Sequence, residues 1–93
     1  MTYELVFVLP GSLEKESQDA LSQKVKKIFT DNGAVLKTQT EWGMKKLAYP
    51  VQHETTGIYL DWTFIVPLKA MKEIHRLLNF ETKLLRYSLL QVN

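Results

Sequence analysis

Two adjacent lysines lie between two aromatic residues near the middle of the chain. Lys45 and Lys46 stand between Trp42 and Tyr49. A lysine ammonium attracts phosphate whatever the base sequence, and an exposed ring offers a face on which an unpaired base can stack. The stretch therefore indicates a contact with nucleic acid. A plain alternative is the far end of a β-strand whose basic face is solvated.

The backbone around the lysines limits how they can act. Gly43 allows a kink or bulge just before them, and Pro50 ends any regular ladder just after them. In an extended strand, successive side chains point to opposite faces, so Lys45 and Lys46 cannot both face the same partner. We therefore expect at most one of them in any single contact surface.

Three further side chains could extend this contact. Lys37 precedes the basic stretch and His53 follows it, so both are expected on the same strand and its loop, while Arg86 is expected on the outward phase of the last strand. Each ring or charge also has a structural alternative. Trp42 could pack against the end of the sheet, Tyr49 could be buried with its hydroxyl bonded, and Arg86 could be a solvated charge.

The composition restricts the class of protein. The chain has 93 residues, which fits one domain over 1–93, and its formal charge of +2 is low for a protein that wraps nucleic acid alone. An RNA contact should therefore use a local patch together with a partner.

No apolar run reaches the ~18 residues of a membrane span, and no signal peptide opens the chain. Without cysteine, disulfides and thiolate chemistry are excluded.

No group of residues points to catalysis. His53 and His75 are far apart in sequence, the serines have no base nearby, and the four glycines form no phosphate-binding loop. We therefore expect no enzyme activity, no cofactor, no metal site and no small-molecule substrate.

The first half of the chain predicts a strand, a helix and the start of a long second strand. Residues 3–9 alternate with apolar residues in both phases, which is typical of a central strand. A helix is predicted over 13–31, with Ser12 as its N-cap and Asn32-Gly33 as its stop. Val35 opens a strand that runs through the basic stretch.

The second half predicts a loop, a strand, a helix and a strand. The loop is expected over 52–57, and the strand over 58–66 has five apolar residues in one phase: Ile58, Leu60, Trp62, Phe64 and Val66. Pro67 suits the first turn of the next helix, whose end Asn79 can cap, and 84–92 forms the last strand.

The resulting order, β-α-β-β-α-β, predicts an α+β, ferredoxin-like split β-α-β fold. Its four-stranded antiparallel sheet should carry both helices on one face. The strands that begin at Tyr3 and Ile58 are expected at the centre, as parallel neighbours.

The outward phases of these two strands hold one ring (Tyr59) and two acids (Glu4 and Asp61), so stacking of bases on the sheet face is not expected. An outward apolar patch suits a protein neighbour; its residues are Val6, Val8, Ile65 and Leu90.

The segment 43–51 resembles the signature of the sixth protein of the bacterial small ribosomal subunit. That signature runs glycine, any residue, a basic residue, a polar or basic residue, Leu-Ala-Tyr and then an aliphatic residue after one intervening position. The likeness extends to Tyr3-Glu4, Pro10 and Gly57-Ile58-Tyr59. The resemblance implies the same fold. It also implies binding to the central domain of small-subunit ribosomal RNA together with the eighteenth small-subunit protein, in a cytoplasmic or organellar ribosome.

By this resemblance, Lys45, Lys46 and Tyr49 are the RNA contacts. The chain departs from the family pattern at His53, where a lysine or arginine is usual, and Trp42 and Asp61 are also unusual.

The alternative function is a homodimeric interaction or regulatory module of the same fold. A small phosphate-ester or acyl-phosphate hydrolase ranks third, because no arginine follows a phosphate-binding loop.

Overall fold

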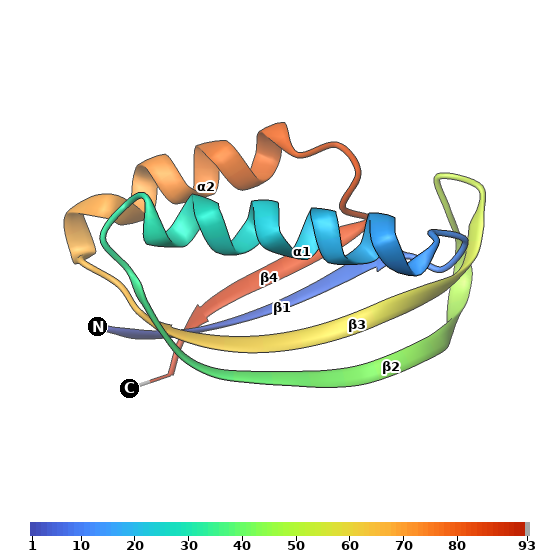
Figure 1. Ribbon diagram of the computed structural model, residues 1–93, viewed down its shortest axis with the longest axis horizontal. Coiled ribbons are helices and arrows are strands. Elements are labelled where there is room, and N and C mark those ends of the chain that lie inside the picture. The colour runs from blue at the N-terminus through green and yellow to red at the C-terminus, as the bar shows by residue number, and fades with distance from the viewer. Residues whose placement is uncertain (93) are drawn as a thin grey trace.

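The computed structural model describes residues 1–92. The elements follow the predicted order, with one short 3-10 helix added before the second α-helix. Their bounds are β1 (Thr2–Pro10), α1 (Lys15–Thr30), β2 (Val35–Val51), β3 (Glu54–Ile65), η1 (Leu68–Ala70), α2 (Met71–Phe80) and β4 (Arg86–Gln91). Figure 1 shows α1 and α2 together on one side of the sheet, with the β2–β3 hairpin at the end away from the N-terminus.

The four strands form one antiparallel sheet in the order β2-β3-β1-β4. This arrangement confirms the ferredoxin-like prediction. The expectation that the two central strands run parallel is wrong, because β1 pairs with β3 in antiparallel register. The crossover through α1 makes β2 parallel to β1, and the tight hairpin then reverses the chain, so β3 runs against β1.

The core lies between the helices and one face of the sheet. All five residues of the predicted inward phase of β3 are buried, and so are Leu5, Phe7 and Leu9 of β1. Helix α1 adds Phe29, whose ring stacks on Phe64 with centroids 4.1 Å apart and planes 7° from parallel. Two rings in such contact contribute about 0.5–1.5 kcal/mol beyond their burial.

The start of α1 differs from the prediction. The helix begins at Lys15 after Glu14, and no side chain caps it. Ser12 instead joins the hairpin, because its hydroxyl donates to a carboxylate oxygen of Glu54 at 2.8 Å and its amide donates to the other oxygen at 3.2 Å. Ser12 was expected to bond to the first amides of the helix, but it bonds to the carboxylate of Glu54 on the hairpin.

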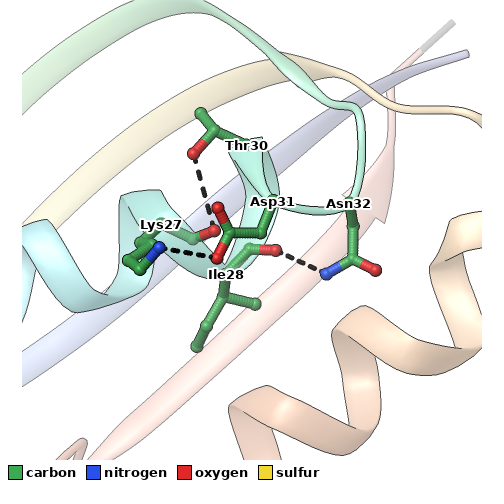
Figure 2. A network of polar contacts seen from close by, with 5 residues as sticks. All are labelled: Lys27, Ile28, Thr30, Asp31 and Asn32. Atoms are coloured by element: carbon green, nitrogen blue, oxygen red, sulfur yellow. Dashed lines mark hydrogen bonds and ion pairs between the residues drawn. The ribbon is translucent and has the colours of Figure 1, made fainter.

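The end of α1 agrees with the predicted stop. Asn32 donates its amide to the carbonyl of Ile28 at 2.7 Å, and Lys27 pairs with Asp31 at 2.9 Å (Figure 2). Gly33 follows with a φ of +83°, in the left-handed region that glycine adopts without strain. Side-chain and backbone partners thus satisfy the last carbonyls of the helix before the chain turns into β2.

Two other boundaries were predicted incorrectly. The loop expected over 52–57 is only a turn at Gln52 and His53, which have φ of 50° and 66°, and β3 already begins at Glu54. Asn79 does not cap α2, because the C-cap residue is Glu81. The side-chain carbonyl of Asn79 instead accepts a hydrogen bond from the Tyr87 hydroxyl at 2.9 Å.

The second face of the sheet carries no helix, and we call it the open face. Val8 points to this face yet is only 4% exposed. The hairpin explains why Val8 is buried. A Cβ placed on Gly57 would stand 2.5 Å from a Val8 methyl and 3.3 Å from a Leu47 methyl, so all three residues lie close together. Val8 therefore belongs to a small contact with Leu47 and is lost from the expected apolar patch.

Two carboxylates, Glu4 and Asp61, occupy the middle of the open face. A hydrogen bond to the Asp61 carboxyl, the negative charge of Asp61 and slight desolvation together raise the pKa of Glu4 above its ordinary value of 4.5. Two acids this close cannot both ionise without cost. Ionisation of this pair therefore opposes folding at neutral pH.

Replacing Gly57 with alanine should destabilise the protein. The new methyl would stand 2.5 Å from a Val8 methyl that is stiff at χ1, so the hairpin or β1 must shift. We expect Gly57→Ala to lower the free energy of unfolding by about 1–3 kcal/mol. Urea unfolding should show a lower midpoint with an unchanged m-value. Thr55→Ala, exposed on the same strand, is the control, and an equal loss in both variants would contradict the steric argument.

Removing one acid of the open face should stabilise the protein in a pH-dependent manner. A folded-state pKa raised above the unfolded value means that stability falls as pH rises from 4.5 through that raised pKa. Asp61→Asn should therefore be more stable than the wild type at pH 7, and the difference should shrink below pH 4.5. Urea unfolding at both pH values measures this. Glu41→Gln on β2 is the control, and a difference independent of pH would rule out the coupling.

Candidate nucleic-acid interface

One row of residues crosses the whole open face near the hairpin. Arg86 of β4 lies opposite Val8 of β1, Val8 lies opposite Tyr59 of β3, and Tyr59 lies opposite Gly43 of β2. Directly opposed residues point to the same face, and neighbouring strands are about 4.8 Å apart, so the row spans about 14 Å. It fixes where the aromatic and cationic side chains around it lie.

Trp42 reaches this row through a β-bulge. Glu41 lies opposite Leu60 and Gly43 lies opposite Tyr59, so Trp42 is the extra residue between them. Gly43 has a φ of +87°, which suits glycine and helps turn the strand at this point. The Trp42 ring lies beside the Tyr59 ring, nearly parallel at 9°, with centroids 6.4 Å apart. Trp42 is 46% exposed, whereas Trp62 in the core is 3% exposed.

Lys45 lies over both of these rings. Its ammonium nitrogen is 5.3 Å from the Trp42 centroid and 5.8 Å from the Tyr59 centroid. The residue opposite Lys45 is Gly57, so no cross-strand side chain competes for this space. Cation–π contacts at such exposed sites contribute about 0.5–1 kcal/mol.

The second lysine of the pair does not join this group. Lys46 lies opposite Thr56, one residue on from the Lys45–Gly57 pair, and so faces the other side of β2. Cross-strand pairing then stops until Val51, and the interruption includes Pro50, although the strand itself continues.

At the other end of the row, Tyr49 and Arg86 contact each other. The guanidinium carbon of Arg86 is 4.8 Å from the centroid of the Tyr49 ring, and its Nη2 donates to the Tyr49 hydroxyl. Tyr49 is 58% exposed, which excludes the alternative of a buried ring. We call the five residues along the row the hairpin-end cluster: Trp42, Lys45, Tyr49, Tyr59 and Arg86.

Besides Lys46, two predicted site residues lie away from this cluster. Lys37 is exposed at the opposite end of β2, next to a register shift between Leu36 and Thr38. His53 is exposed in the turn at the tip of the hairpin. Tyr59 was not among the predicted site residues, because a lone ring on a face with two acids does not indicate that Trp42 lies beside it.

Metal-binding clusters and membrane-spanning helices were also sought in the described chain. Over residues 1–92, no three or more histidines, cysteines or acids gather closely enough to hold a metal ion. No helix in that range is both long and apolar enough to cross a membrane.

Comparison with known proteins identifies the family of this chain. The family model described as Ribosomal protein S6 matches residues 2–91. Small ribosomal subunit protein bS6 of Clostridioides difficile (strain 630) is 36% identical over 85 residues, which cover 91% of this chain and 91% of the relative. The protein of the same name from Campylobacter jejuni is 32% identical over 85 residues, covering 91% of this chain and 68% of that protein.

A solved structure shares the fold. The crystal structure of 30S ribosomal protein S6 from Thermotoga maritima matches with a TM-score of 0.89, over 98% of this chain and 86% of that chain, at 21% identity. The family match spans nearly the whole chain and includes the basic stretch. The chain therefore belongs to the ribosomal protein S6 family of the small ribosomal subunit, whose members are structural proteins and not enzymes.

Proposed function

We propose that this protein binds the central domain of small-subunit ribosomal RNA together with the eighteenth small-subunit protein, in a cytoplasmic ribosome. Family membership implies association with the small subunit and its RNA. The observation that carries the finer proposal is the hairpin-end cluster, where exposed rings and cations share one row of the open face.

The cluster suits an RNA strand that crosses the end of the sheet. Lys45 and Arg86 lie toward opposite ends of the row and would bind phosphates, while Tyr49 positions Arg86 through its ring and its hydroxyl. Lys46, on the other side of β2, would bind a phosphate that passes the sheet edge. Lys37 and His53 lie at the two ends of the β2 strand and its turn, so we assign them only outlying contacts.

The rest of the open face suits a protein partner. Ile65 pairs with Thr2 and Leu90 pairs with Glu4, so both lie toward the start of β1, away from the hairpin. Ile65 is 43% and Leu90 is 62% exposed, and Val6 lies half-buried between them and the cluster. An RNA strand and a protein can therefore use separate parts of this face. A formal charge of only +2 also favours a partner that supplies further cations.

Loss of the two lysines should weaken RNA binding in a salt-dependent manner. We expect Lys45→Ala combined with Lys46→Ala to reduce the slope of log affinity against log salt by about 1–2, because each lost phosphate contact removes about one unit. The measurement is a binding titration on a central-domain junction RNA across a salt series, with and without the eighteenth protein.

The matched control is Lys69→Ala combined with Lys72→Ala, which removes the same charge from the helix side of the molecule. An equal change of slope in both double variants would show that net charge, and not the cluster, governs binding. A wild-type protein that forms a stable homodimer in light scattering and has no salt-dependent RNA affinity would contradict the proposal altogether.

A polar residue at Leu90 should weaken the protein contact and leave the RNA contact intact. Leu90 is exposed, so Leu90→Ser should change the free energy of unfolding by no more than about 0.5 kcal/mol. We expect a lower affinity for the eighteenth protein in calorimetry, with an unchanged salt slope for RNA. Leu68→Ser, equally exposed at the start of the helix layer, is the control. Unchanged partner affinity in Leu90→Ser would remove this patch from the interface.

A further inference from the structure

Trp42 is a half-exposed tryptophan at the hairpin end of the open face. A tryptophan that is 46% exposed leaves a large apolar surface in water, and the chain buries its other tryptophan almost completely. The Gly43 bulge, which turns Trp42 toward Tyr59, is a specific backbone feature. The two rings thus form a nearly parallel pair on the open face, with a cation beside them.

We infer that Trp42 and Tyr59 form a stacking site for one unpaired base of single-stranded RNA, with Lys45 binding the adjacent phosphate. This inference rests on the proposed function and deepens it, because it names the chemical class of ligand at the cluster. Bases in a duplex are stacked on one another and offer no free face to a ring, so a paired segment would gain only the phosphate contacts.

The magnitudes allow a base to take the place that Lys45 occupies. A base stacked on an aromatic side chain strengthens binding about 5- to 100-fold, which is more than a cation–π contact at an exposed site provides. Lys45 is a long exposed side chain opposite Gly57, so its ammonium is free to turn from the rings to a phosphate. The base and the lysine would then act on the same nucleotide.

The charges of the open face limit the direction in which a bound RNA strand can run. Asp61 follows Tyr59 on the same face and Glu4 lies next to it, so phosphates are repelled from the middle of the sheet. Arg86 lies across the row from the rings, about 14 Å from Gly43 by strand spacing. The RNA strand should therefore run along the row, from Lys45 toward Arg86, and not parallel to the β-strands β1 and β3.

The experiment follows tryptophan emission at low salt while a short oligoadenylate or an RNA duplex of equal length is added. Trp62 is buried and serves as an internal reference that should not respond. We expect the single strand to quench the emission and to bind more tightly than the duplex. Trp42→Leu should abolish the quenching and reduce the affinity about 5- to 100-fold, whereas Trp42→Phe should retain most of the affinity.

Equal binding of single strand and duplex, or unchanged affinity in Trp42→Leu, would overturn the stacking site. The same variants are then tested on the junction RNA with the eighteenth protein. If Trp42→Leu binds that complex like the wild type, the stacking site is wrong and the proposed function stands. If the wild type fails to bind the complex but binds oligoadenylate through Trp42, the proposed function fails and the stacking site stands.

Discussion

The burial of a single face of the sheet is the constraint on which the rest of this structure depends. Both helices lie on the same side, and the inward phases of β1 and β3 fill the space beneath them, with Phe64 against Phe29. A chain of this length has too few apolar residues to cover a second face. The open face is thus a consequence of how the core is built, and it is the surface to which we assign the proposed RNA and protein contacts.

A second, smaller contact shapes the end of that face. Gly57 leaves room for Leu47 to pack beside Val8, which joins the hairpin to the central strand β1. The contact between Ser12 and Glu54 holds the same hairpin from the start of α1. With the hairpin joined to the domain at these two points, Tyr49 reaches Arg86 across the sheet, and a two-stranded ribbon that would be only marginally stable by itself gains tertiary contacts.

The strand and helix order, the ferredoxin-like fold, the four buried residues of β3 and the buried Val66 just after it could be predicted from the sequence, because periodicity reports which side of an element is buried. The pairing of Trp42 with Tyr59 could not, since it depends on a bulge that shifts the register by one residue. The Tyr49–Arg86 contact depends on strand order and on the bend of the hairpin. Ser12 was misassigned because a local rule for helix caps does not consider a partner 42 residues away.

The division of charge over the open face explains how a weakly basic protein can bind RNA. The acids Glu4 and Asp61 lie in the middle, while Lys45 and Arg86 lie in the row near the hairpin. A net charge averages over both regions and therefore understates the attraction at the hairpin end. The acids add specificity by repelling phosphate from the apolar part of the face. A positively charged partner on that part would relieve the repulsion between the two carboxylates, which raises the pKa of Glu4.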